Sequence, residues 1–233
     1  MTARYASLIL AAQFTLCLTA WAQDHLEPEQ GMLNQSRIGW DYGQRLREVL
    51  MKDASRYHLA RMVCLPAFEA EWVLTVVRED PKDFDGPHTY YVECVVAERK
   101  LFPPKESQGV VAKKARAPID GATAESLNRV WRRMLRRTRY PTVTGVGADG
   151  VDYHFSRFLP LIDCGQPDPL GGWEEGRIWS PDEESPCGEL VAIGEWLKSY
   201  AQARSEDRDR ARREIRERVA KLGARLDRAE SKE

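Results

Sequence analysis

The sequence predicts an α+β fold, in which an antiparallel sheet of hairpins carries about three packed helices and a charged C-terminal helix follows. Three observations lead to this prediction. Short runs rich in valine, threonine and aromatic residues are separated by turn-forming segments, as in antiparallel hairpins. Other segments repeat apolar residues every three or four positions, which is the spacing of amphipathic helices. Beyond Arg204 the chain is dense in charges of both signs and lacks proline and aromatic residues, so a separate helical element is expected there.

The first 22 residues have the organisation of a secretory signal peptide. Arg4 precedes an almost wholly apolar stretch from Leu8 to Ala20, and the A-x-A sequence at residues 20–22 provides the small residues that signal peptidase requires. The apolar stretch is shorter than the roughly 20 residues of a membrane-spanning helix. We therefore expect cleavage between Ala22 and Gln23, and a periplasmic or secreted protein that has no transmembrane anchor.

The mature chain divides into a leader, one domain and a tail. Residues 23–35 show little periodicity and predict a flexible leader, whereas residues 36–202 contain the periodic segments of a single α+β domain. Apolar residues at helical spacing predict a helix between Asp41 and Tyr57. Strands are then expected over residues 60–68, 71–78 and 89–99, with turn residues at 80–87 between the last two.

The second half of the domain contains two further helical patterns. Thr123 can cap one helix, and Ser185 can cap the other with Pro186 in the favoured first position. These helices are expected over residues 124–139 and from residue 186 onward. The hairpin between them covers residues 142–146 and 151–158 around a glycine-rich turn, and loops are expected at 102–118 and 161–185.

The C-terminal residues 203–233 form the charged tail. Acidic residues precede basic residues by four positions several times, which favours a helix by about 0.2–0.5 kcal/mol per pair. Apolar residues follow the heptad spacing of a coiled coil, although for fewer than three heptads; they are Ile215, Val219, Leu222 and Leu226. We expect a helix, or a short coiled coil, that is dispensable for folding of the domain and through which copies of the chain can self-associate.

Composition excludes some classes of protein. Hydrophobic residues make up 42% of the chain and charged residues 30%, and the net charge of −1 disfavours a nucleic-acid partner. Cys17 lies in the signal peptide, and the other four cysteines lack the close spacing of a structural zinc site, so no metal is expected. In an oxidising compartment we favour disulfides Cys64–Cys94 and Cys164–Cys187 among three connectivities. The alternative is reduced thiols in a packed interior.

A dense arginine cluster is the strongest candidate for a binding surface. It lies on the helix predicted over residues 124–139, opposite the apolar stripe, and consists of Arg132, Arg133, Arg136, Arg137 and Arg139. Arginine presents a planar fork of donors that suits phosphate, an anionic glycan or an acidic protein. The alternative is a solvated helix face whose arginines pair with acidic residues elsewhere in the chain.

Asp152, His154 and Ser156 alternate with apolar residues and so share one face of a predicted strand. These residue types suggest a catalytic triad. Alternate strand residues lie roughly 6.5–7 Å apart, however, whereas a nucleophile and its base need about 2.6–3.2 Å. We therefore expect a solvated strand face. Trp173 and Trp179, in the loop predicted next, can stack on a sugar ring, but such residues more often anchor their loop to the core.

Four short sequences carry a family resemblance. They are LPAFEAEW at residues 65–72, WRRMLRRTRYP at 131–141, GADGVDYHFS at 147–156 and WSP at 179–181. Together they resemble a family of uncharacterised bacterial exported proteins, over most of residues 60–200. The resemblance implies a bacterial source and the fold of that family, but no activity and no functional residues.

No segment carries a catalytic motif, and no catalytic residue or cofactor is expected. The sequence favours a non-enzymatic exported domain that binds a protein or an anionic component of the cell envelope. Two alternatives stay open. One is an envelope hydrolase with a site assembled from dispersed residues, and the other is a structural module that oligomerises through its C-terminal helix.

Overall fold

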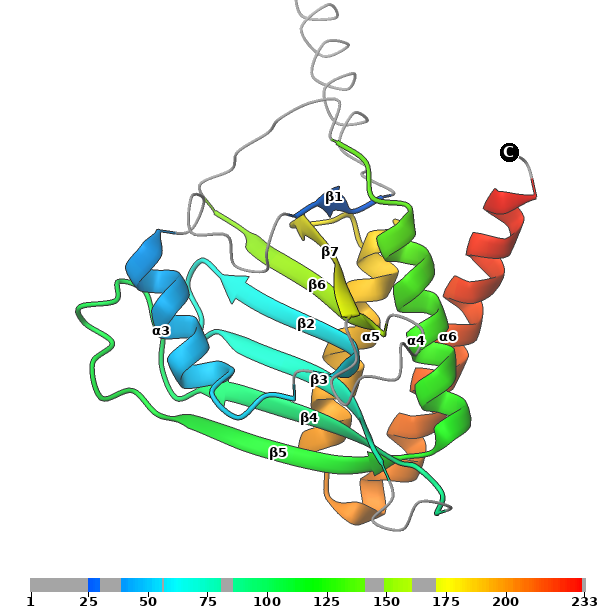
Figure 1. Cartoon of the computed structure of the whole chain (residues 1–233), viewed down its shortest axis with the longest axis horizontal. Helices are drawn as coiled ribbons and strands as arrows, with labels where there is room; N and C mark the ends of the chain where they lie inside the picture. The colour runs from blue at the N-terminus through cyan, green and yellow to red at the C-terminus, as the bar shows by residue number, and fades with distance from the viewer. Residues whose placement is uncertain are drawn as a thin grey trace, which may run out of the picture.

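A computed structural model of the chain describes residues 25–29, 39–55, 57–80, 86–140, 149–160 and 171–231. The predicted signal peptide, its cleavage site and the strand expected at residues 142–146 lie outside the described residues. The predicted α+β class is confirmed by a single antiparallel sheet that carries helices on both faces (Figure 1).

The sheet has seven strands, and each neighbouring pair is antiparallel. The strands are β1 (Glu27–Pro28), β2 (His58–Pro66), β3 (Trp72–Glu79), β4 (Thr89–Ala97), β5 (Ala112–Ile119), β6 (Val151–Pro160) and β7 (Gly171–Trp179). Their order across the sheet is β1-β7-β6-β2-β3-β4-β5. Strands β2 to β5 therefore form a meander, after which the chain returns to place β6 on the other edge of β2.

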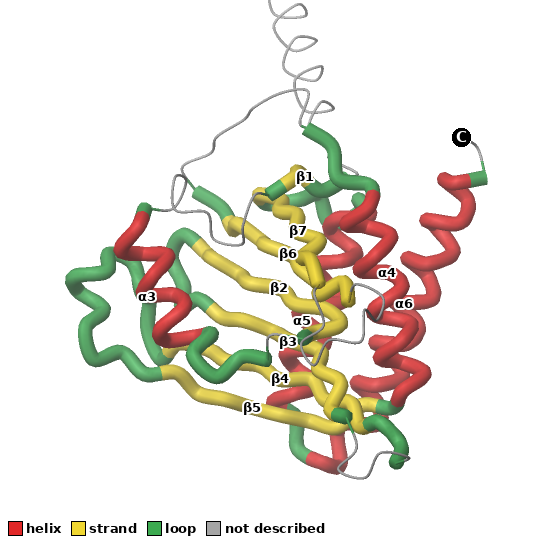
Figure 2. The backbone as a smooth tube through the Cα atoms, viewed as in Figure 1, coloured by secondary structure: helices red, strands yellow, loops and turns green. Residues whose placement is uncertain are grey.

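The described residues form four α-helices. They are α3 (Trp40–Leu50), α4 (Gly121–Arg136), α5 (Pro186–Gln202) and α6 (Arg208–Glu230), with a short 3-10 turn, η1 (Ser205–Asp207), before the last. Helices α3, α4 and α5 pack on the sheet, and α6 packs on α4 and α5. Helix α3 lies on one face, whereas α4, α5 and α6 lie together on the other (Figures 1 and 2). Every helix in the described residues falls short of the length and apolar character that a membrane span requires.

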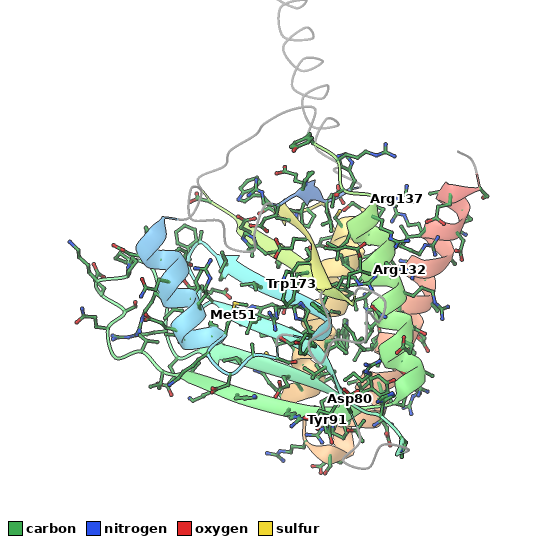
Figure 3. All side chains as sticks on the ribbon, in the orientation of Figure 1. Met51, Asp80, Tyr91, Arg132, Arg137 and Trp173 are labelled. Carbon is green, nitrogen blue, oxygen red and sulfur yellow. The ribbon has the colours of Figure 1, made fainter. Side chains whose placement is uncertain are left out.

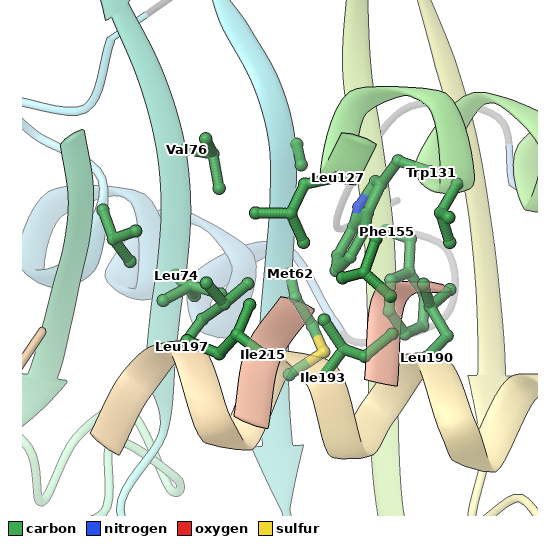
Figure 4. Packing of buried hydrophobic residues seen from close by; sticks show 14 of the residues in the cluster. Met62, Leu74, Val76, Leu127, Trp131, Phe155, Leu190, Ile193, Leu197 and Ile215 are labelled. Carbon is green, nitrogen blue, oxygen red and sulfur yellow. The ribbon is translucent and has the colours of Figure 1, made fainter. Parts of the chain in front are cut away.

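The central strands are apolar on both faces because helices cover both. On β2, Met62 belongs to the core beneath α4 and α5, whereas its neighbour Val63 belongs to the smaller core beneath α3. Residues of three helices and six strands converge in the larger core, including Leu127 and Trp131, Ile193 and Leu197, Ile215, and Met62, Leu74 and Phe155 (Figure 4). Gly194 lets α5 approach β2, because a Cβ at this position would lie 2.6 Å from Met62 Sδ.

Trp131 fixes α4 on the sheet. Its side chain is fully buried and its indole Nε1 donates a hydrogen bond of 3.2 Å to the carbonyl oxygen of Arg61 on β2. The ring also meets Phe155 of β6 edge to face, with 5.9 Å between the centroids. The N-terminus of α4 is capped by Asp120, which accepts from the Thr123 amide at 3.0 Å, so the cap lies three residues before the predicted one.

The C-terminal helix belongs to the helical layer and is not a separate tail. All four residues of its apolar seam are buried against the rest of the chain: Ile215, Val219, Leu222 and Leu226. Arg216 further joins α6 to the start of α4, because it donates to Thr123 Oγ1 and to Asp120 Oδ2, each at 2.8 Å. The seam therefore faces the rest of the chain and not a second copy in this structure, and α6 packs on the domain that was predicted to end at residue 202.

Four segments differ from the sequence prediction. Residues 112–118 and 171–179 were expected in loops, but they lie in the edge strand β5 and the glycine-containing strand β7. The predicted hairpin of residues 151–158 with residues 142–146 is wrong, because β2 and β7 occupy both edges of β6. The predicted flexible leader is wrong at its described residues, since Leu26 is fully buried and β1 pairs with β7.

The other helices agree more closely with prediction. Ser185 caps α5 and accepts from the Gly188 amide at 2.9 Å, with Pro186 in the first turn, as the sequence predicts. Helix α3 begins near the predicted position but ends at Leu50, seven residues before the expected end.

The predicted Cys64–Cys94 disulfide is absent, because both cysteines are free and buried. Cys64 is opposite Trp72 and Cys94 is opposite Leu74, so the whole width of β3 separates them. Two strand spacings amount to roughly 10 Å, well beyond the 4.4–6.8 Å between Cα atoms in a disulfide. Burial raises the pKa of both thiols, that of Cys94 to about 12, so they are unreactive. Cys164 lies outside the described residues, and its bridge to the buried Cys187 stays a prediction.

We expect Leu222→Ala to destabilise the whole domain, because the fully buried side chain joins α6 to the core. A buried leucine truncated to alanine costs about 2–5 kcal/mol, which lowers the melting temperature of a protein of this size by roughly 5–20 °C. Thermal unfolding followed by circular dichroism measures this. Arg213→Ala, at an exposed position of the same helix, is the matched control and should change the melt little. Equal melts for the two variants would contradict the packing of α6.

Candidate functional site

The structure divides the predicted arginine cluster. The apolar stripe of α4 packs on the sheet, so arginines on either side of that stripe turn toward different elements. Arg133 faces α6, where its guanidinium lies 2.7 Å from Asp227 and 2.9 Å from Glu230. It also donates to the carbonyl of Gly223. Arg133 is therefore a structural link between two helices, and two carboxylates face its guanidinium.

Arg132 and Arg136 lie one turn apart on the side of α4 that faces β6 and β7. Arg136 Nε is 3.4 Å from Glu174 Oε1 on β7, and both Arg132 and Arg136 are exposed. Arg137 follows the last helical residue and is separated from Arg132 along the axis of α4 (Figure 3). The backbone amide of Arg139 donates to the Leu26 carbonyl, and this bond ties the end of α4 to β1.

The structure adds a third guanidinium, which sequence reasoning missed. Arg157 lies on β6 directly opposite Glu174 of β7, on the face of the sheet that α4 covers. It is only 6% exposed, and its Nη1 is 3.2 Å from Glu174 Oε2. Among the described residues neither its Nε nor its Nη1 has an aligned hydrogen-bond acceptor. A buried guanidinium thus keeps unused donors beside two exposed arginines.

The charges of this arginine site do not balance among the described residues. Glu174 pairs with two of the three guanidinium groups, those of Arg136 and Arg157, and the charge of Arg132 acts on Arg157. Three positive charges thus lie beside one described carboxylate. Burial lowers the pKa of Arg157; Glu174 opposes this shift, and Arg132 and Arg136 add to it. The lowered pKa reflects a site that disfavours further positive charge. Such a site is stabilised by an oxyanion that accepts from the guanidinium forks.

A signal for Arg157 was present in the sequence. Tyr153, Phe155 and Arg157 are alternate residues of one strand, so the apolar face predicted for that strand ends in an arginine. A charged residue in a core-facing position is rarely buried without a partner or a function. Its association with Arg132 and Arg136 was not visible, because it depends on how α4 crosses the sheet.

The opposite face of β6 carries the three polar residues that suggested a triad. Asp152, His154 and Ser156 share that face as expected, but His154 and Ser156 are buried, so the predicted solvated face is wrong for them. Each finds partners on other segments. Ser156 Oγ is 2.8 Å from His58 Nε2 on β2, and His154 Nδ1 is 2.7 Å from Glu29 just after β1.

The Ser156–His58 pair has the spacing of a nucleophile and its base. Both residues are at most 2% exposed, however, and the ring of Trp173 packs 5.0 Å from that of His58. Trp173 itself is 40% exposed and also packs edge to face on Phe158, as an anchoring residue of β7 would. In this arrangement a substrate has no access to Ser156 Oγ, so the pair is part of the packing between strands.

Buried charges hold β1 and the residue after it on the sheet. Arg177 of β7 lies 2.7 Å from Glu27 and 3.2 Å from Asp152, and Asp152 is 3.4 Å from His154 Nε2. Burial disfavours the imidazolium of His154, but the hydrogen bonds and charges of Asp152 and Glu29 outweigh burial. They raise the pKa of His154 to about 9. His154 is therefore protonated at neutral pH and completes an ionic network that fixes the N-terminal segment.

Comparison of the chain with known protein families, with curated proteins and with solved structures found no match.

We expect the stability of the folded state to fall as pH rises from about 6.5 to 9, because of His154. Its folded pKa of about 9 lies above the unfolded value of about 6.5. The stabilisation is complete below pH 6.5 and is lost as pH rises through 9, to a total of about 3 kcal/mol. Urea unfolding across this range should show the slope in the wild type and its absence in His154→Gln.

His88→Gln, which changes a histidine with an exposed carboxylate partner, is the control and should keep the wild-type slope. An NMR titration of the His154 ring gives the pKa directly. A midpoint near 6.5, or an unchanged slope in His154→Gln, would show that the ionic network does not hold the imidazolium.

Proposed function

We propose that the protein is a non-enzymatic exported domain that binds an anionic group of a protein or of a cell-envelope component. The arginine site, formed by Arg132, Arg136 and Arg157, is the binding site in this proposal. The observation that supports it most strongly is the buried guanidinium of Arg157, which keeps donors without aligned acceptors among the described residues.

Burial of Arg157 lowers the stability of the folded protein but would strengthen the binding of an anion. A buried donor without an acceptor costs free energy, because its hydrogen bonds to water are lost and not replaced. A bound oxyanion would supply the missing acceptors in surroundings of lower dielectric than water, where charge-assisted hydrogen bonds are stronger. The exposed Arg132 and Arg136 would then close around the anion from the side of α4.

Glu174 acts as an internal competitor in this proposal. Its carboxylate is the group that Arg136 and Arg157 contact when no other anion is bound. An incoming oxyanion must share these arginines with Glu174 or displace it. The affinity of the site is therefore expected to be moderate and to rise when the carboxylate of Glu174 is removed.

The proposal also includes the localisation of the domain, which we expect to be exported. The charged start, the apolar stretch and the A-x-A sequence at residues 20–22 support secretion into the periplasm or beyond it. Anionic groups of envelope components and of exported proteins are then the ligands within reach of the arginine site.

We expect inorganic phosphate to bind the wild-type protein, and Arg157→Gln to weaken that binding by about 10–100-fold. The factor corresponds to the loss of a charge-assisted hydrogen bond, which contributes about 1.5–3 kcal/mol. Isothermal titration calorimetry at fixed ionic strength measures the affinity. Sulfate and acetate, titrated in parallel, distinguish tetrahedral oxyanions from carboxylates.

Two variants serve as matched controls. Arg129→Gln removes the same charge from an exposed position of α4 and should leave the affinity close to that of the wild type. Glu174→Gln should increase the affinity. Equal losses in Arg129→Gln and Arg157→Gln would reduce the effect to general attraction by a basic surface, and the proposal would be wrong.

We expect the exported protein to begin at Gln23 when the full chain is expressed in a bacterial host. N-terminal sequencing of the protein from the periplasm and the medium tests this. Ala22→Arg should block processing, because signal peptidase requires a small residue there. A native protein that retains Met1 would contradict export.

A further inference from the structure

A cavity beside α5 shares no residue with the arginine site. It has a volume of about 470 Å³ and is bounded by the start of β6, the turn between β7 and α5, and parts of α5 and α6. A volume of this size suits a small ligand or one long side chain.

The turn that forms one wall of this cavity is held firmly. Ser180 adopts φ 38°, in the left-handed region that residues with a side chain seldom occupy. Its amide donates to the Val151 carbonyl at 2.8 Å, and its Oγ accepts from the Val151 amide at 2.9 Å. Gly188 is packed closely against the backbone of Asp182 in the same turn. The wall is therefore in place before any ligand binds.

Aromatic rings and carboxylates line the cavity together. Tyr153 of β6 and Trp196 of α5 contribute the rings, and Glu183 and Glu195 contribute the carboxylates. Glu183 is exposed and has no ion-pair partner within the described part of the chain. Burial raises the pKa of Glu195, and Lys198 opposes that shift, so this carboxylate stands in partly apolar surroundings.

Two cations lie at the cavity, and each also has a partner outside it. Arg218 lines the cavity with its guanidinium 5.4 Å from the centre of the Trp196 ring, but its Nε is 2.8 Å from Glu214. Lys198 Nζ is 3.6 Å from Glu195 and also lies 4.3 Å from the centre of the Trp72 ring. Glu195 therefore shares its cation with Trp72, and Glu183 is the carboxylate of the cavity that has no ion-pair partner among the described residues.

We infer that this cavity binds an alkylammonium group on an apolar stem, the chemistry of a lysine side chain presented by a peptide or protein. The stem would lie against Val191 and the ring of Tyr153, and the ammonium group would reach Glu195 and Glu183. Aromatic faces attract cations as well as apolar stems, and both properties occur together here. An anionic ligand is disfavoured by the two carboxylates.

The test uses Nα-acetyl-lysine methylamide as the probe and its Nε-acetylated form as the neutral control of the same stem. Binding is followed by the backbone amide signals of Val191 and Ala192 in nitrogen–proton correlation spectra. We expect the charged probe to shift these signals saturably and the neutral form to bind at least tenfold more weakly. Glu195→Gln should weaken binding of the charged probe at least tenfold, whereas Glu206→Gln, at an exposed position in η1, should not.

Equal binding of the charged and neutral probes would reduce the cavity to an apolar cleft and overturn the inference. An unchanged affinity in Glu195→Gln, with its amide spectrum otherwise intact, would overturn it as well. Because the probe is a cation and the arginine site takes anions, failure here does not bear on the proposed function.

Discussion

The contact between Trp131 and β2 determines how the helical layer meets the sheet. The indole of Trp131 donates a hydrogen bond to the backbone of the central strand β2, and its ring packs on Phe155. Helix α4 can therefore neither rotate nor slide without losing both contacts. With α4 in this orientation, Arg133 turns toward α6 and Arg132 turns toward β6. The predicted arginine cluster is therefore divided between a structural contact with α6 and the proposed binding site beside β6.

The arginine site illustrates how a folded protein can hold a charge that does not favour its own stability. A well-packed apolar side chain at position 157 would avoid the cost of burying a guanidinium. Glu174 offsets part of that cost, but its carboxylate is shared between Arg157 and Arg136. The ionic network around His154, on the other face of β6, has more carboxylates and holds the N-terminal segment. One strand thus carries a structural network on one face and the proposed binding site on the other.

Sequence patterns predicted the elements whose signal lies within one segment. The stripe of α4, the Ser185 cap of α5 and the β3–β4 hairpin all depend on residues close together in the chain. Strand β5 was missed because its outward residues are mostly charged and its inward residues mostly small, as an edge strand allows. Strand β7 was also missed, because it begins with two glycines and carries charged residues on both faces. Contacts such as Arg157 with Arg132, or Ser156 with His58, require the strand order, which local patterns do not contain.

In the proposed function, Arg157 holds donors ready for an external oxyanion. The most direct measurement is a titration with phosphate in which the Nε–Hε signals of the arginine side chains are observed by NMR. We expect the Arg157 signal to shift saturably and by more than the signal of the exposed Arg129. The phosphate concentration at half of the full shift should agree with the affinity measured by calorimetry. A fixed Arg157 signal, or equal small shifts of every arginine, would contradict the claim.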